Sequence, residues 1–197
     1  MNLALAATVF GVIFVAELPD KTMIATLLMG SRSNPRAVWI GAALAFICQM
    51  AIAAVAGRFL SLLPHLALEI VVTLLFLGGA AYLLFVPESE EIAEGEAEAE
   101  SEAAGSLLRV AVTAFGVIFI GEFGDLTQIL AANFVARSHQ PWIVFIASSL
   151  ALLCVSALAA FGGQALLRVL PLSRIRKGGG LLLAAFGIYS LVSILVG

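Results

Sequence analysis

Two acidic residues three positions apart, Glu17 and Asp20, interrupt an otherwise apolar stretch near the start of the chain. The same pair recurs 105 positions later as Glu122 and Asp125, and the fifteen residues that end two positions beyond each aspartate share nine identities. A spacing of three places both acids of a pair on one face of a helix. Ionisable side chains inside a membrane are costly and mark functional sites by default. The repeated pair therefore predicts one site to which both copies contribute.

Oxygen atoms are the donors that this pattern supplies. Pro19 separates the acids of the first pair and Gly124 those of the second, and both residues weaken a helix, which frees backbone carbonyl groups. Carboxylate, hydroxyl and carbonyl oxygens suit hard divalent cations such as Ca²⁺, Mn²⁺ or Mg²⁺, and they suit soft copper poorly. We predict a metal site formed by Glu17, Asp20, Thr22, Glu122, Asp125, Thr127 and Gln128.

Lys21 follows the first acidic pair, whereas Leu126 holds the same place after the second. Ion pairing that merely holds helices together is the alternative explanation for the acids, but one lysine cannot neutralise four carboxylates. Burial favours a protonated carboxyl group, whereas a bound cation favours the ionised form. Metal binding would therefore release protons, and protonation on the other side of the membrane would release the metal. This predicts exchange of a divalent cation for protons.

The composition places these motifs in a membrane. Of the 197 residues, 62% are hydrophobic and only 12% are charged, and the mean hydropathy is +1.11, which is typical of a polytopic membrane protein. A helix needs about 20 mostly apolar residues to cross the hydrocarbon core. We predict an all-α protein with six transmembrane helices, of which the first in each half is broken, at about residues 3–30, 37–63, 66–86, 107–135, 142–167 and 178–196.

A short acidic segment divides the chain into two halves. Eight of the chain's thirteen acidic residues lie between Glu88 and Glu102, in a segment with no apolar face to bury. Such a segment repels itself and stays solvated. We predict three-helix repeats at residues 1–86 and 107–197, joined by a disordered acidic linker at residues 87–106.

Because each half contains three spans, the two halves must enter the membrane from opposite sides, as in the inverted repeats of many secondary transporters. Basic residues in short loops mark the cytoplasmic side. With both termini outside and the acidic linker in the cytoplasm, the outer loops carry only Arg58 and Arg137. The cytoplasmic side then carries Arg32, Arg36, Arg109, Arg168, Arg174, Arg176 and Lys177.

Other features bound the function. We predict that Gln49 and Asn133 make hydrogen bonds between helices. No nucleophile–base set is evident, so we expect a transporter rather than an enzyme, with no cofactor and with the cation as substrate. The expected partners are a divalent cation, protons and the lipid bilayer, without nucleic acid, and a homodimer is among the assemblies that the sequence permits.

The paired motif resembles a known family. The chain is similar to the transmembrane protein 165 family of the lysine-exporter superfamily. That family has two copies of Glu-x-Gly-Asp-(Lys/Arg)-(Thr/Ser), each in the first helix of a three-helix repeat, and an acidic loop joins the repeats. The resemblance implies exchange of Mn²⁺ or Ca²⁺ for protons. It also implies that the cation is bound by the motif acids, with the threonines alongside, at Glu17, Asp20, Thr22, Glu122, Asp125 and Thr127.

This chain departs from the family motif at Pro19, where the motif has glycine, and at Leu126, where it has a basic residue. The first departure keeps a helix break, and the second makes the two half-sites electrically unequal. Two alternatives stay open at this point. The superfamily resemblance also permits an exporter of a small organic cation such as an amino acid, and the acids alone also permit an uncoupled cation channel or a metal sensor.

Overall fold

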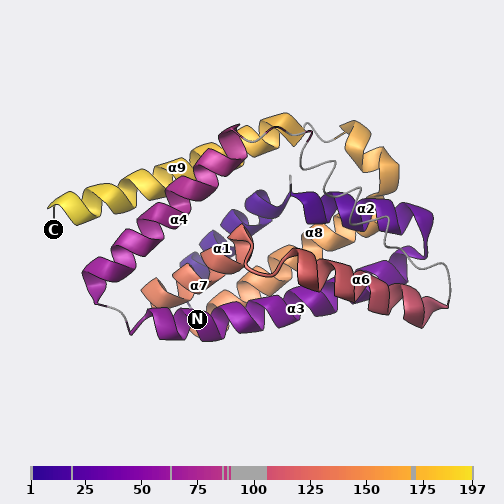
Figure 1. The fold of residues 1–197 in the computed structure, drawn as a ribbon, viewed down its shortest axis with the longest axis horizontal. Helices are drawn as coiled ribbons and strands as arrows, with labels where there is room; N and C mark the ends of the chain where they lie inside the picture. Colours follow the sequence, from indigo (N-terminus) through magenta and orange to yellow (C-terminus); the bar gives the residue numbers. More distant parts are fainter. Residues whose placement is uncertain are drawn as a thin grey trace.

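The structure, a computed structural model, describes residues 2–18, 20–62, 64–85, 106–169 and 172–196, together with residues 87 and 89. Helices, and no strands, make up the secondary structure of this part of the chain (Figure 1). Their bounds are α1 Leu3–Glu17, α2 Lys21–Arg32, α3 Pro35–Leu60, α4 His65–Phe85, α6 Leu107–Gly121, α7 Leu126–Ser138, α8 Pro141–Val169 and α9 Leu172–Val196. The predicted acidic linker lies outside the described residues except at 87, 89 and 106.

Both predicted helix breaks are present. Helices α1 and α2 meet at an angle of 69°, and α6 and α7 meet at 68°. Within the described residues, four further helices are long and apolar enough to cross a membrane, and counting each bent pair as one span gives six. The prediction of an all-helical polytopic membrane protein is therefore confirmed. Pro19, to which we attribute the first break, lies outside the described residues.

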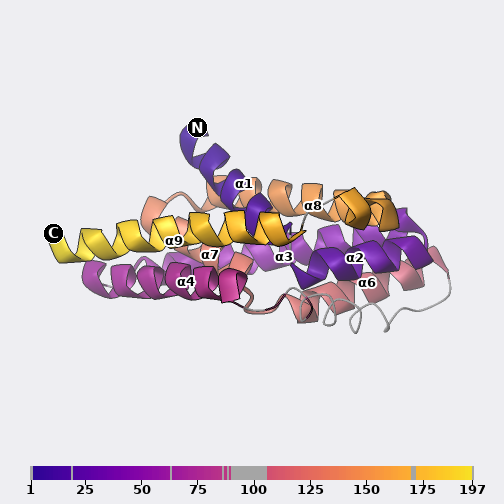
Figure 2. The ribbon, with the colours of Figure 1, turned by 90° about the horizontal axis from the view of Figure 1, so that it is seen from above.

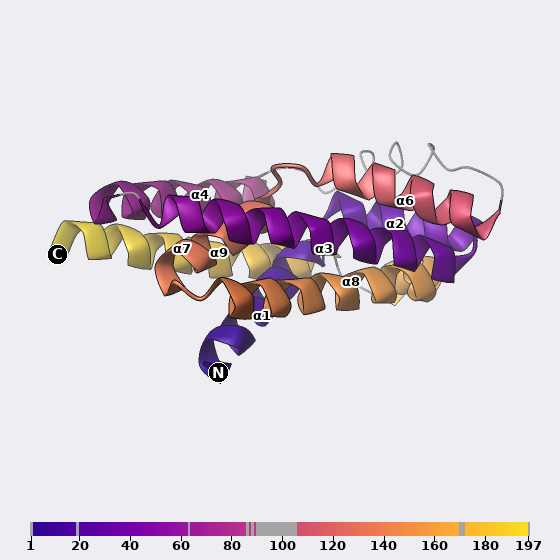
Figure 3. The same ribbon diagram turned by 90° about the horizontal axis from the view of Figure 1, so that it is seen from below.

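The two halves of the chain pack through equivalent helices. The third spans of the two halves, α4 and α9, lie side by side, and the middle spans, α3 and α8, pack against each other (Figures 1 and 3). Each broken span packs on the middle span of the opposite half, α1 and α2 on α8 and α6 and α7 on α3. This exchange buries the glutamate of each break, Glu17 and Glu122, while the N-terminal end of α1 projects from the body (Figure 2). The inverted orientation of the halves across a membrane stays a prediction.

Close approach of backbones supports the contact between α3 and α6. A Cβ atom added at Gly41 would clash with the carbonyl oxygen of Ala111, so the helices would have to separate. Overpacking of this kind costs about 1–3 kcal/mol. We expect Gly41→Ala to lower the thermal unfolding midpoint of the detergent-solubilised protein by several degrees. The control is Gly116→Ala on α6, where an added Cβ meets nothing within 4 Å, and an equal loss in both variants would contradict the prediction.

Candidate metal site

The same backbone turn closes both helix breaks. In the first, the N–H of Asp20 donates to the carbonyl oxygen of Glu17 at 3.1 Å, and in the second the N–H of Asp125 donates to that of Glu122 at 3.2 Å. Each glutamate stands at the end of one helix, and each aspartate is the N-cap of the next. The acids of a pair are therefore joined by a tight turn between two helices, at the helix break that the sequence predicted.

Three of the four predicted acids come together. Carboxylate oxygens of Glu17, Asp20 and Glu122 all lie within 4.8 Å of one another, and the three residues are only 0%, 8% and 2% exposed. Oxygen ligands lie about 2.3–2.6 Å from Ca²⁺, so two ligands on opposite sides of one ion are about 4.8 Å apart. The three side chains, contributed by both halves of the chain, are therefore close enough together for a single divalent ion to contact all of them.

The fourth acid, Asp125, lies beside this cluster rather than within it. It is half-buried and lines a small cavity together with Asp20 and Thr127. The volume of this cavity is about 10 Å³, which is close to the smallest volume that holds one water molecule. The phenol-bearing Tyr82 of α4 lines the same cavity and was missed as a site residue. The repeat is the sequence signal that could have identified it, because Tyr189 stands at the matching place in the second half.

Both predicted threonines are buried close to the acids in the sequence. Thr127 is 3% exposed and lines the small cavity. Thr22 is 0% exposed, and its hydroxyl oxygen has no hydrogen-bond partner among the described residues. A buried hydroxyl group without a partner costs free energy. An ion or a water molecule bound near Thr22 would offset that cost.

Gln128 is engaged with the protein rather than turned to the acids. Its Oε1 accepts a hydrogen bond from the N–H of Gly124 at 2.8 Å, and its Nε2 donates to Oε1 of Gln49 on α3. The Nε2 of Gln49 in turn donates to the carbonyl oxygen of Phe119 on α6 at 2.7 Å. This confirms the predicted interhelical hydrogen bonding of Gln49. For Asn133 the same prediction is wrong, because neither atom of its buried amide group has a partner among the described residues.

With this geometry in place, the comparisons with known proteins decide the family. A family model described as "Divalent cation/proton antiporter GDT1" matches residues 5–91 and 110–196. The chain belongs to this family. Its members are transporters rather than enzymes, and the cation is their substrate, so no cofactor is called for.

Individual relatives cover nearly the whole antiporter. GDT1-like protein 5 of Arabidopsis thaliana is 26% identical over 91% of this chain and 92% of its own length. GDT1-like protein sll0615 of Synechocystis is 26% identical over 90% of this chain and 92% of its own length. GDT1-like protein 3 of Oryza sativa subsp. indica is 27% identical over 90% of this chain and 70% of its own length. No solved structure matches significantly.

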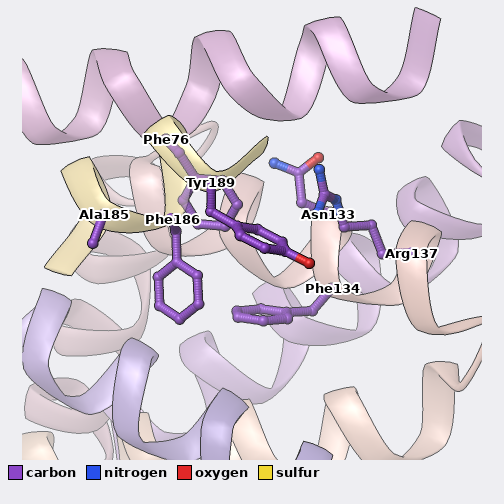
Figure 4. Close-up of a pocket in the computed structure, with 7 residues that line it drawn as sticks. All are labelled: Phe76, Asn133, Phe134, Arg137, Ala185, Phe186 and Tyr189. Atoms are coloured by element: carbon purple, nitrogen blue, oxygen red, sulfur yellow. The ribbon is translucent and has the colours of Figure 1, made fainter. Parts of the chain in front are cut away.

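The larger cavities of the antiporter lie elsewhere. One of about 420 Å³ lies between α4, α7 and α9 and is lined mainly by aromatic side chains (Figure 4). Among the described residues its polar lining is Asn133, Arg137 and the hydroxyl group of Tyr189, without a carboxylate. The positive charge of Arg137 repels a cation. Within the described part of the antiporter, the group of clustered acids at the helix breaks is therefore the better candidate for a cation site.

The two half-sites of the antiporter differ at the aspartates and at the residues that follow them. Oδ1 of Asp20 accepts a hydrogen bond from the N–H of Lys21 at 2.8 Å, whereas Asp125 makes no side-chain capping hydrogen bond. Leu126, which replaces the basic residue of the second motif, packs on α4 so closely that a Cβ atom on Gly79 would lie 2.6 Å from its Cδ1. The second half-site thus has an apolar contact where the first has a lysine.

Proposed function

We propose that this protein exchanges Mn²⁺ or Ca²⁺ for protons through a site formed by Glu17, Asp20 and Glu122. The observation that carries this proposal is the meeting of three buried carboxylates from both halves of the chain within 4.8 Å. Asp125 and the hydroxyl groups of Thr22 and Thr127 complete the set of oxygen donors.

The electrostatics of the cluster supports coupling to protons. Three carboxylates this close repel one another when ionised, so their charge has to be offset by protons or by a cation. A divalent ion and protons therefore compete for the same oxygens. If the cluster opens to one side of the membrane at a time, each metal ion that leaves is replaced by protons from that side, which is antiport.

The small size of the cavity beside the acid cluster favours an ion over an organic substrate. The cavity between Asp20 and Asp125 has room for about one water-sized sphere, far less than an amino acid requires. All of the proposed donors are oxygen atoms, which Ca²⁺ and Mn²⁺ both accept. We further propose the inverted arrangement of the halves, with both termini outside and the acidic linker in the cytoplasm, which the distribution of arginine and lysine supports.

The experiment is transport into liposomes that contain the purified protein, a metal-sensitive dye and a pH-sensitive dye. With Mn²⁺ or Ca²⁺ outside, we expect the metal to enter while protons leave, and an imposed proton gradient to drive metal uptake against its own gradient. Metal entry without proton movement would instead indicate an uncoupled channel. Transport of a cationic amino acid without any dependence on metal would indicate an organic-cation exporter, and either result would overturn the proposal.

A further inference from the structure

The two helix breaks are built from different residues at equivalent positions. Gly124 in the second break takes the place of Pro19 in the first, and four residues later Gln128 takes the place of Met23. The middle spans differ in a similar way at the residue that follows the matching cysteines, Cys48 and Cys154. This residue is polar on α3 and apolar on α8. It is Gln49 on α3, which contacts the second break, and Val155 on α8, which packs with the first.

Two backbone groups of the second break are bonded by glutamine side chains instead of by the helical pattern. The N–H of Phe123 donates to the carbonyl oxygen of Ile120 at 3.2 Å, so the carbonyl of Phe119 loses its usual partner four residues on. Gln49 donates to that carbonyl. Gly124, which adopts a positive φ of 85°, has an N–H outside the helical pattern, and Gln128 accepts from it. The two glutamines thus supply one acceptor and one donor where the break requires them.

The first break does not need either glutamine. There the N–H of Leu18 keeps its helical hydrogen bond to the carbonyl oxygen of Phe14 at 3.1 Å. The next residue is a proline, which has no N–H to satisfy. Met23 and Val155 are correspondingly apolar, and they belong to one buried cluster with Leu27 and Ala159. The glutamines thus stand at the break whose backbone groups they bond, and apolar side chains occupy the equivalent positions at the other break.

We propose that Gln49 and Gln128 are positioning residues for the second half-site. Joined to each other by the hydrogen bond from Nε2 of Gln128 to Oε1 of Gln49, they form one chain from α3 to the break that contains Glu122. This chain holds Glu122 where its carboxylate meets the acids of the first half. Neither glutamine is required to touch the ion. The inference rests on the proposed function, because it assigns the two residues to the same cation site.

The decisive variant is Gln128→Met, which removes the hydrogen bonds of the Gln128 side chain and uses the residue that the other half already accommodates. The measurements are the dissociation constant for Mn²⁺ by titration calorimetry in detergent, the KM and maximal rate of metal transport in liposomes, and the thermal midpoint. We expect the Mn²⁺ dissociation constant and the KM to rise at least about tenfold, because an unheld break lets Glu122 move away from the other acids. The double variant Gln49→Val, Gln128→Met should bind Mn²⁺ no more weakly than the more impaired of the two single variants, since the two residues act as one chain.

Asn133→Met is the matched control. It makes the same amide-to-thioether change on the same helix, at a buried residue without a hydrogen-bond partner in the described structure, and it should leave Mn²⁺ affinity unchanged. A lower thermal midpoint with wild-type affinity in Gln128→Met would overturn the proposal, as would additive losses in the double variant. If the wild type itself neither binds nor transports a divalent cation, the proposed function fails first. If the wild type transports the metal and Glu122→Gln does not, while Gln128→Met binds Mn²⁺ with wild-type affinity, only the positioning role of the two glutamines is contradicted.

Discussion

Replacing Glu122 with glutamine is expected to lower the rate of Mn²⁺ or Ca²⁺ transport at least about 100-fold and to abolish the accompanying proton movement. The substitution keeps the shape of the side chain and removes one negative charge from a cluster whose oxygens lie within 4.8 Å of one another. Two unit charges about 4 Å apart interact by about 4 kcal/mol at an effective dielectric constant of ~20. A divalent ion in direct contact loses at least a comparable amount, and about 1.4 kcal/mol corresponds to a tenfold change in affinity.

Glu17→Gln should have the same effect, because Glu17 occupies the equivalent position and is fully buried. The matched control is Glu69→Gln on α4, which makes the same chemical change at a half-buried acid that lines a different pocket, with Arg137 and His139. Its transport rate should stay within about twofold of the wild type. Rates are to be compared at equal amounts of reconstituted protein with unchanged thermal midpoints. Wild-type exchange in both Glu17→Gln and Glu122→Gln would remove the cluster from the mechanism.

Replacing Leu126 with lysine, which restores the basic residue of the family motif, is expected to weaken metal binding at least about tenfold. Leu126 lines the small cavity together with Asp20 and Asp125, so a lysine there places a positive charge beside the ion. At about 8 Å, a unit charge repels a divalent ion by about 4 kcal/mol at an effective dielectric constant of ~20. Bending of the flexible lysine away from the site reduces this energy, which is why the expected change is smaller than the full repulsion implies.

The measurement is the Mn²⁺ dissociation constant of the purified protein, with Leu126→Met and Leu126→Gln as controls. The methionine variant keeps an apolar side chain against Gly79, and the glutamine variant adds polarity without charge. If charge is the cause, only the lysine variant loses affinity. Equal losses in the lysine and glutamine variants would attribute the effect to the lost packing against α4, and the electrical explanation would be abandoned.

Much of the fold was predictable because the bilayer restricts the outcome so strongly. A span must be about 20 apolar residues long, and all of its backbone groups must be bonded internally. The six spans and the two breaks follow from these requirements, together with glycine, proline and acids at the break. The ends of the bent spans did not follow as well. Helix α2 continues to Arg32 and α7 to Ser138, because polar residues remain helical at a membrane surface until a cap intervenes, which hydropathy does not detect.

The candidate site was predictable in its residues and less so in its geometry. The repeat identified the four acids as candidate site residues. A single acid in an apolar helix is easily accommodated by local contacts, whereas the same costly pair in both halves indicates a function. The repeat did not indicate that Asp125 lies beside the cluster while Glu17, Asp20 and Glu122 form it. That depends on how the helices of each half pack on the middle span of the other.

The chain's pattern of apolar and acidic residues thus determined that it is a membrane protein of bent and straight helices, and which side chains are candidates for binding a cation. Only the tertiary structure decided which of these side chains meet, and what Gln128 and Asn133 contact. Hydropathy and spacing report a residue's depth and the helical face on which it lies. A hydrogen bond between helices depends on their rotation and separation to within about 1 Å, because its geometry tolerates little more than that. Packing of the whole chain sets those quantities, and for that reason Gln128 is hydrogen-bonded whereas Asn133 has no such bond among the described residues.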